Sequence, residues 1–541
     1  MPIALGLAVL AHLGLLLGAL GLLRPGILIA VIAGVAVIAV GVHCAGWWRP
    51  SPGGRECDGR GDGGEGSSWL LLAILALVLA PLILLALYPP TAFDETMYHL
   101  PFARAFAESG GLPATPTLRF PVFPALAEVL AAQMLLLFND VATHFISLLA
   151  VLTTAGLLLT WGREAFSEQA GWIAAALWLG NPIVVHLGGT GYVEPLLTLF
   201  VTGALYAAWR YRQSEEISWL LLAAAFAGTA AGVKYLGLFF AAAIFVYLAL
   251  ARRKPFLFAI AAFLVLAPTY IRIAAHTGNP IFPFLPSLFG STSWDPIALT
   301  PASELLSMDT VIRFLRLPWD VVFNRSAVGQ QPPFSPFYLL LLLGLRDPRV
   351  RRLLVLPLVW AAVFLFLPRD SRYLVPILPL LSLALAGMIR IEKRSLLAAV
   401  CILAILPGWL YAGYRIAKQG PPPLTAEQRE LYLTRKLPLY PAIRELDRIS
   451  DVAYAFNAEH MKYFYEGPLY GDWLGPASYR RLRPLVEKPE LLHRELRKLG
   501  ATHLLMSKIP NAIRPARKSN WERWFRKVRD DSAAEIYKLA E

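Results

Sequence analysis

The sequence has 541 residues, of which 57% are hydrophobic and 16% charged, and its formal net charge is +13. Soluble globular proteins carry about 25% charged residues, so this composition excludes a soluble fold for most of the chain. A mean hydropathy of +0.53 and many apolar runs of about 20 residues, the length that crosses a bilayer, predict a polytopic α-helical membrane protein. The basic excess is typical of cytoplasmic loops and gives no reason to expect a nucleic-acid partner.

The cysteines and the N-terminal residues exclude further kinds of protein. The three cysteines, Cys44, Cys57 and Cys401, form no CxxC or His/Cys pattern, so neither a disulfide framework nor a zinc site is supported. The first basic residue, Arg24, follows the first apolar run instead of preceding it. We therefore interpret that run as a retained span and not as a cleaved signal.

Hydropathy predicts about thirteen transmembrane helices. A shorter apolar piece at 124–138 contains Glu128 and Gln133, and we expect it to return without crossing. The predicted spans are 3–22, 27–47, 69–88, 141–161, 170–187, 193–209, 217–233, 235–250, 255–274, 334–345, 353–367, 373–389 and 395–414.

Charge predicts the orientation of these spans. With the N-terminus inside, most Lys and Arg of the connecting loops fall on the cytoplasmic side, as the positive-inside rule requires. The short outer connections then hold only Arg24, Lys234, Arg369 and Arg372. If 124–138 crossed, every later loop would change side and the pattern would fail.

This topology divides the chain into three parts. Residues 1–68 form two helices and a Gly-rich cytoplasmic loop, and residues 69–414 form the main membrane domain with outer loops 89–123 and 275–333. Residues 415–541 form a small soluble domain on the outer side. Helix-like stretches there alternate with strand-like runs, DVAYAF and ATHLLMS, which predicts an α/β fold.

The outer loop FDETMYHL places two carboxylates, Asp94 and Glu95, side by side at the end of an apolar span. A carboxylate here could act as a general base or ligate a divalent metal ion through oxygen. The plainer alternative is that Asp94 caps the helix that follows, which explains one acid but not both. The next residues, MYHLPFARAFAESGG, are amphipathic and predict an interfacial helix.

Further charged residues lie at the same predicted face. Glu194 opens a span before Pro195, and ionisable residues at such positions usually serve function. Lys234, Arg369 and Arg372 break the charge rule and suit a lipid-linked phosphate, because Lys and Arg both bind phosphate. The alternatives are snorkelling of Lys234 to headgroups and a local ion pair within Arg369-Asp370-Ser371-Arg372.

Together these stretches resemble the GT-C superfamily of polyprenyl-phosphate-sugar-dependent glycosyltransferases, in the branch that holds protein O-mannosyltransferases and the lipid A aminoarabinose transferase. The similar motifs are FDETMYHLPFARAFAESGGL at 93–112, RFPVFPALAEVLAAQMLLLF at 119–138, Glu194-Pro195, GVKY around Lys234, GNPIFP at 278–283 and RYLVP at 372–376. The resemblance covers residues 69–390.

The resemblance implies roles for individual residues. Asp94, Glu95 and Glu194 would be catalytic, with Asp94 as the base and with Asp94 and Glu194 as candidate ligands of a divalent metal ion. The substrate-binding residues would be Tyr98, His99, Lys234, Arg369, Arg372 and Tyr373. Two departures matter: Glu194 replaces the usual Asp, which puts metal ligation there in doubt, and Met97 replaces a basic residue of the aminoarabinose transferases.

The expected function is transfer of a sugar from a polyprenyl-phosphate donor to a glycan, lipid or protein acceptor on the outer face of the plasma (inner) membrane. The transfer would invert the anomeric centre, and the periplasmic or extracytoplasmic C-terminal domain would select the acceptor. The rival hypothesis is a lipid-linked-sugar flippase. Transporters usually place ionisable residues near the membrane midplane within paired repeats, and this sequence shows neither.

Overall fold

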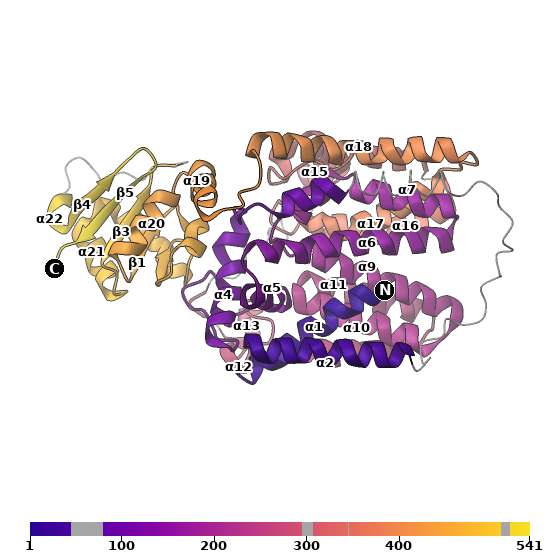
Figure 1. Cartoon of the computed structure of the whole chain (residues 1–541), viewed down its shortest axis with the longest axis horizontal. Helices are drawn as coiled ribbons and strands as arrows, with labels where there is room; N and C mark the ends of the chain where they lie inside the picture. The colour runs from indigo at the N-terminus through magenta and orange to yellow at the C-terminus, as the bar shows by residue number, and fades with distance from the viewer. Residues whose placement is uncertain (45–78, 291, 295–306, 345, 510–519) are drawn as a thin grey trace.

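The computed structural model describes residues 1–44, 79–290, 292–294, 307–344, 346–509 and 520–541. Within them, a bundle of helices carries a small α/β domain at one end (Figure 1). The Gly-rich loop predicted at 53–66 and half of the span predicted at 69–88 lie outside the described residues.

The bundle is built from helices that follow the predicted apolar runs closely. Prolines at the first or second helical position begin many of them, where the missing N–H costs no hydrogen bond. The α-helices are α1 (Pro2–Ala19), α2 (Pro25–Cys44), α4 (Leu100–Ser109), α5 (Leu126–Leu137), α6 (His144–Ala165), α7 (Glu168–Leu179), α8 (Pro182–Gly188), α9 (Glu194–Ser214), α10 (Ile217–Val233), α11 (Leu236–Leu250), α12 (Pro255–Thr277), α13 (Pro286–Phe289), α15 (Met308–Phe323), α16 (Pro348–Phe364), α17 (Leu378–Met388) and α18 (Arg394–Gln419).

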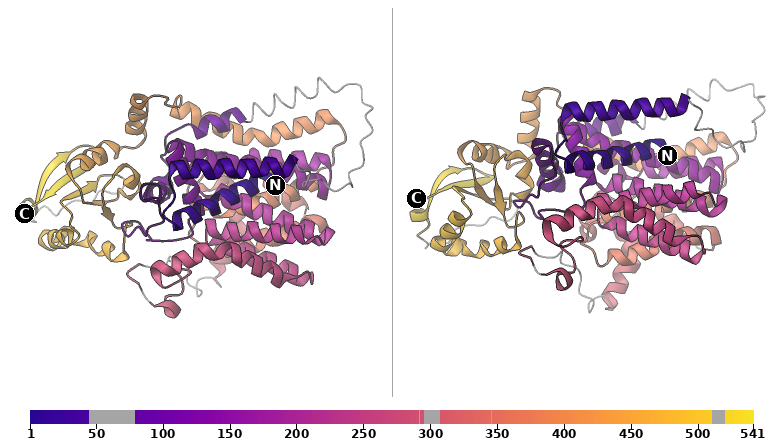
Figure 2. Two further views of the ribbon diagram at one scale, coloured as in Figure 1. Left: turned by 60° about the horizontal axis from the view of Figure 1, so that its bottom comes forward. Right: turned by 90° about the horizontal axis from the view of Figure 1, so that it is seen from below.

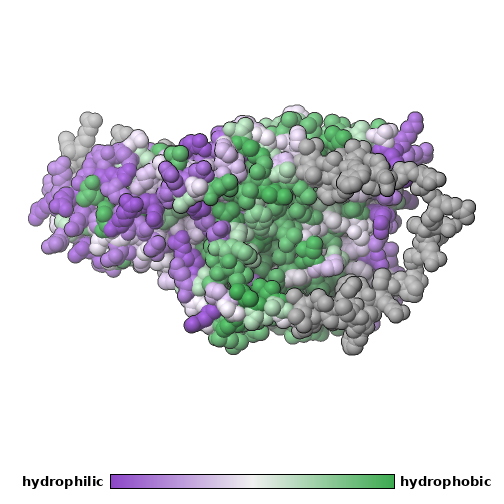
Figure 3. Space-filling view, in the orientation of Figure 1, coloured by the Kyte–Doolittle hydropathy of each residue, from purple (hydrophilic) through white to green (hydrophobic). Residues whose placement is uncertain are grey.

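The outer surface of this bundle is apolar. Large side chains such as Leu250, Phe256 and Leu264 are 83%, 73% and 67% exposed, and Figure 3 shows a broad hydrophobic belt over the bundle beside a hydrophilic C-terminal domain. In water such a surface would promote aggregation, whereas lipid chains cover it without cost. The chain is therefore a multi-pass membrane protein.

Helix length and composition in the described residues do not confirm the predicted count of thirteen spans. Among the described residues, five helices are long and apolar enough to cross a bilayer, and a sixth crossing results if α7 and α8, bent by 67°, form one span. The span predicted at 334–345 is wrong: Pro336–Gly344 is a 3-10 helix. Nine residues at about 2 Å rise reach about 18 Å, short of the ~30 Å hydrocarbon core.

Helix α5 runs across the bundle axis, since it is seen end-on in Figure 1 and upright in the right-hand view of Figure 2. Even if α5 stood perpendicular to the membrane plane, its 12 residues would extend only about 18 Å. This orientation agrees with the prediction that 124–138 does not cross. It also brings α5 against α4 and α1.

The two ends of the bundle carry different charged residues. Helix α9 begins at Glu194 and ends at Ser214, so Glu194 and Arg210 lie at opposite ends. Arg210 pairs with Glu164 at 2.8 Å, and Arg253 pairs with Glu215. The loops that follow α6, α9 and α11, all predicted to be cytoplasmic, therefore meet at the end away from the C-terminal domain (Figure 1).

The C-terminal domain is α/β, as predicted. Its five-stranded sheet has the order β2-β1-β3-β5-β4, with β1 parallel to β2 and β3 and with β5 antiparallel to β3 and β4. The runs DVAYAF and ATHLLMS contain β1 and β3. Its elements are α19 (Ala426–Lys436), α20 (Tyr440–Ile449), β1 (Ala453–Phe456), β2 (Leu469–Gly471), α21 (Pro489–Lys498), β3 (His503–Ser507), α22 (Trp521–Trp524), β4 (Phe525–Asp530) and β5 (Ala534–Leu539).

Candidate active site

Asp94 does not act as a helix cap. It precedes a five-residue π-helix, Glu95–His99, and its side chain makes no capping hydrogen bond. Instead, its Oδ2 accepts hydrogen bonds from the Tyr98 hydroxyl at 3.0 Å and from Arg372 Nη1 at 2.9 Å. The capping alternative is therefore wrong, and the carboxylate faces a cation from a distant part of the chain. Single turns of π-helix occur often at functional sites.

Arg372 is fixed by its own local structure. Asp370 caps the 3-10 helix Ser371–Ile377 by accepting from the backbone N–H of Arg372. Asp370 Oδ2 also accepts from Arg372 Nε at 2.9 Å, so the local ion pair predicted here is confirmed. The same guanidinium reaches Asp94 and lies 4.3 Å from the ring centre of Tyr192. Gln331 donates to Asp370 at 3.2 Å.

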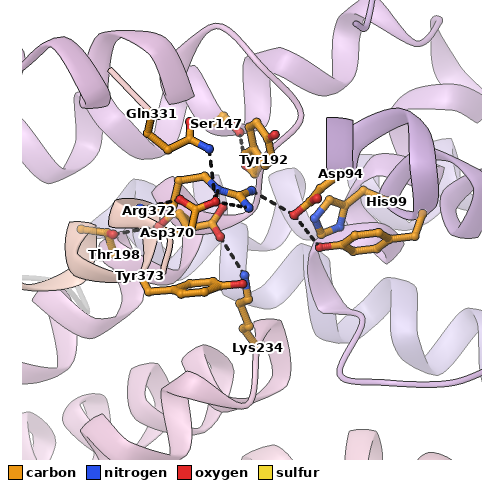
Figure 4. Close-up of polar contacts among 12 residues, drawn as sticks. Asp94, His99, Ser147, Tyr192, Thr198, Lys234, Gln331, Asp370, Arg372 and Tyr373 are labelled. Atoms are coloured by element: carbon orange, nitrogen blue, oxygen red, sulfur yellow. Dashed lines mark hydrogen bonds and ion pairs between the residues drawn. The ribbon is translucent and has the colours of Figure 1, made fainter. Parts of the chain in front are cut away.

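A second cation, Lys234, lies in the same cluster as Arg372 and Tyr373 (Figure 4). Lys234, between α10 and α11, donates to Glu194 Oε1 at 2.7 Å. Its ammonium group also lies 4.9 Å from the ring centre of Tyr373. Glu194 is fully buried at the start of α9, and its Oε2 has no hydrogen-bond partner among the described residues. Two acids from separate elements thus join one site, as the sequence suggested but could not show.

Glu95 lies apart from this cluster. It is fully buried, its Oε1 pairs with His144 at 2.5 Å and accepts from the backbone N–H of Gly191 at 2.9 Å, and its Oε2 accepts from the backbone N–H of Ala92. These contacts tie the acid loop to α6 and to the turn before α9. They favour a structural role for Glu95, and its predicted catalytic role stays a prediction.

His99 pairs with an acid that the sequence analysis did not assign. Its Nδ1 lies 2.5 Å from Glu128 on α5, while His99 Nε2 and Glu128 Oε2 are buried without partners among the described residues. Both residues line a cavity of about 20 Å³ together with Ser147 and Tyr192. That is room for one water molecule but not for a sugar. An acid inside an apolar stretch was the available signal for Glu128.

Of the remaining residues predicted to bind substrate, two lie in the cluster and one lies outside it. Tyr373 lies in the cluster of Figure 4, and Tyr98 joins it through its hydrogen bond to Asp94. Arg369 is exposed and joins no ion pair among the described residues. Within the described residues, no three His, Cys, Asp or Glu side chains converge as metal ligands. Asp94 and Glu194 each pair with a cation, so these carboxylates do not fit a divalent ion as they stand.

The C-terminal domain packs directly on the acid loop. The Thr96 hydroxyl donates to the His460 carbonyl at 2.6 Å, and the Phe93 ring stacks on His460 at 5.5 Å. Burial lowers the pKa of His460, so this contact is made by a neutral imidazole. Arg429 pairs with Asp140 at 2.5 Å on the same side. The site therefore lies where the apolar bundle meets the C-terminal domain, whose surface is hydrophilic (Figure 3).

Two family models and one curated relative match parts of the chain. Residues 120–271 match the family model described as dolichyl-phosphate-mannose-protein mannosyltransferase, and residues 428–538 match a family described as SF2091/S2213. Over 138 residues the chain is 32% identical to the uncharacterized protein SF2093/S2215 of Shigella flexneri, which corresponds to 25% of this chain and 69% of that protein.

Solved structures share the fold. ArnT from Cupriavidus metallidurans, bound to undecaprenyl phosphate, superposes with a TM-score of 0.53 at 14% identity over 87% of this chain and 98% of that chain. An Archaeoglobus fulgidus oligosaccharyltransferase in complex with Zn and sulfate gives a TM-score of 0.52 at 13% identity over 80% of this chain and 68% of that chain. The chain therefore belongs to the same family as the uncharacterized Shigella protein and shares its fold with ArnT and with the archaeal oligosaccharyltransferase.

Proposed function

We propose that this protein transfers a sugar from a polyprenyl-phosphate donor to an acceptor at the extracytoplasmic face of the plasma membrane. The observation that carries the proposal is the pair of contacts Asp94–Arg372 and Glu194–Lys234, located at the end of an apolar bundle under a soluble domain. The polyprenyl tail would lie in lipid against the bundle. The acceptor would enter from the aqueous side, where the C-terminal domain lies.

The cations would bind the donor phosphate. Arg372 and Lys234 each hold a carboxylate in the structure. A donor phosphate that binds these cations would compete with Asp94 and Glu194 for them. A carboxylate that loses its cation becomes a stronger base, so Asp94 would gain basicity when the donor is bound. Base strength and donor binding would thus be coupled.

The transfer step then follows from these contacts. Asp94 Oδ2 removes the proton from the acceptor hydroxyl, and the acceptor oxygen forms a bond to the anomeric carbon of the sugar. The bond between that carbon and the phosphate oxygen breaks. Arg372 and Lys234 stabilise the negative charge on the departing polyprenyl phosphate. A single displacement of this kind inverts the anomeric configuration.

The test supplies radiolabelled polyprenyl-phosphate sugars and a membrane extract as acceptor to the purified full-length protein. Wild type should transfer label with inversion, as read from the anomeric coupling of the released product. Asp94→Asn should lose activity by about 100-fold or more, the usual contribution of a general base. Asp309→Asn, an exposed acid paired with Arg313 on α15, is the matched control and should keep full activity. Retained activity in Asp94→Asn would refute the assignment of the base.

A further inference from the structure

Four basic residues gather where the bundle joins the C-terminal domain. Arg415 and Lys418 lie at the end of α18, and Arg435 and Lys436 lie at the end of α19. Lys436 Nζ donates to the Lys418 carbonyl at 3.1 Å, and Arg435 donates to the Gln419 carbonyl at 2.5 Å. Figure 1 shows this place at the end of the bundle that carries the C-terminal domain. The four basic residues are called the junction cluster below.

The junction cluster has no acidic partner in the part of the chain that the structure describes. None of its members forms an ion pair there. Arg415 donates to the His186 ring and, at 3.4 Å, to the Tyr411 hydroxyl, and neither group is negatively charged. Burial, and then the positive charges of the other three members, lower the pKa of Lys436. Four positive charges therefore lie together with no carboxylate among the described residues to neutralise them.

Helix ends supply only part of the missing negative charge. The C-termini of α18 and α19 meet in the junction cluster, and each carries a partial charge of about −0.5. They offset about one of the four positive charges, so the cluster is more basic than the capping of two helices requires. The positive-inside rule does not explain the excess either, because the predicted topology puts the junction on the outer side of the membrane.

Exposed aromatic and apolar side chains place the junction cluster at the membrane interface. Tyr414 is 60% exposed, and its ring centre lies 5.8 Å from Lys418 Nζ. Leu424 and Leu431 are 83% and 70% exposed. Leu431 precedes Arg435 by one helical turn, so both lie on one face of α19. Tyrosine collects at the level of lipid headgroups, and exposed leucines beside cations suit a surface that lies on lipid.

We propose that the junction cluster binds the phosphate group of an anionic phospholipid in the outer leaflet of the membrane. Arg and Lys side chains both bind phosphate, Arg in bidentate fashion and Lys as a point charge. The lipid chains lie against the exposed leucines, and the headgroup lies between the ends of α18 and α19. A bound lipid therefore links the bundle to the C-terminal domain. The four residues differ from those of the candidate active site, and lipid binding does not depend on sugar transfer.

The experiment measures equilibrium binding of fluorescently labelled phosphatidylglycerol to the full-length protein in a non-ionic detergent. Lys418→Gln combined with Lys436→Gln should weaken the affinity about thirtyfold, the contribution of two cations at an anionic lipid surface. Arg526→Gln combined with Lys538→Gln is the matched control and should leave the affinity unchanged. It removes the same charge from two exposed residues that are paired between β4 and β5.

Two outcomes of this measurement would overturn the proposal. The first is equal affinity in the two double variants, because the binding would then follow the net charge of the protein and not the junction cluster. The second is a wild type that binds phosphatidylcholine as tightly as phosphatidylglycerol, because the four cations would then not select an anionic lipid.

A charge-conserving variant separates binding from folding. Lys418→Arg combined with Lys436→Arg should bind phosphatidylglycerol as wild type does, and weak binding in this variant as well would overturn the role of charge. Unlabelled polyprenyl phosphate should displace the labelled lipid no better than unlabelled phosphatidylglycerol does. Tighter competition by polyprenyl phosphate would overturn the phospholipid assignment in favour of a site for the donor phosphate.

Discussion

The buried Glu194–Lys234 pair offers a prediction whose size follows from the structure. Glu194 has no exposed surface, and within the part of the chain that the structure describes its Oε1 accepts a hydrogen bond from Lys234 at 2.7 Å. Lys234→Met would leave the buried carboxylate without its hydrogen-bonded cation, and removal of one partner of a buried ion pair costs about 3–5 kcal/mol of stability. Glu194→Gln in addition removes that charge, so the double variant should recover most of the stability lost in the single variant.

The assay is thermal unfolding of full-length wild type, both single variants and the double variant, combined with donor turnover. Lys234→Met should lower the apparent Tm by several degrees, and the double variant should return close to wild type. Turnover should fall in all three variants, because the cation and the acid both belong to the candidate site. If Lys234→Met unfolds at the wild-type temperature, then Lys234 does not stabilise the buried Glu194 carboxylate, and the reasoning from burial is refuted.

Three other predictions concern single carboxylates. Asp370→Asn keeps the helix cap but removes the negative charge that pairs with Arg372, so the affinity for the donor should rise about threefold to tenfold. The measurement is the KM for the donor, and an unchanged KM would show that Asp370 does not compete with the phosphate. Glu459 has a folded pKa of about 7 against an ordinary value of 4.5, so the folded state binds more protons and loses stability as pH rises from about 4.5 to 7. Glu459→Gln should therefore be more stable than wild type by about 1–3 kcal/mol at pH 8 and equal to it near pH 4 in thermal unfolding, and a gain at pH 4 would contradict the assignment. Glu95→Gln should reduce the apparent Tm while the folded fraction keeps its turnover, the opposite of Asp94→Asn; loss of turnover at unchanged stability would make Glu95 catalytic.

Sequence reasoning found the charged cluster because charge is costly near lipid. Lys234, Arg372 and Glu194 break hydropathy or the positive-inside pattern, and such violations persist mainly where function requires them. The outer position alone suggested that they share a site. The structure adds the pairing, which depends on long-range packing that no local pattern encodes.

The distinction between Asp94 and Glu95 could not be predicted. Adjacent helical residues point about 100° apart, so one carboxylate faces the cluster and its neighbour faces α6. Only the helix orientation decides which is which. Tyr192 was missed for another reason: a tyrosine at the edge of an apolar span is common at membrane interfaces and gives no functional signal.

The fold was also predicted in part: most helices were found from the sequence, and some short elements were not. Apolar runs predicted most helices within a few residues, because burial and lipid contact both select the same side chains. The run at 334–345 failed as a span because Pro332, Pro333 and Pro336 precede or begin it and leave a short 3-10 helix. Strand β4, FRKVRD, was missed because its exposed edge position gives it charged residues where a buried strand has apolar ones.

The most direct test of the central claim is a measurement in sealed proteoliposomes with the labelled polyprenyl-phosphate sugar confined to one leaflet and acceptor extract on one side. The account predicts label transfer to the acceptor by wild type, none above background by Asp94→Asn, and no movement of the donor between leaflets by either protein. Movement of the lipid-linked sugar across the bilayer without transfer to any acceptor would contradict the account and identify a flippase.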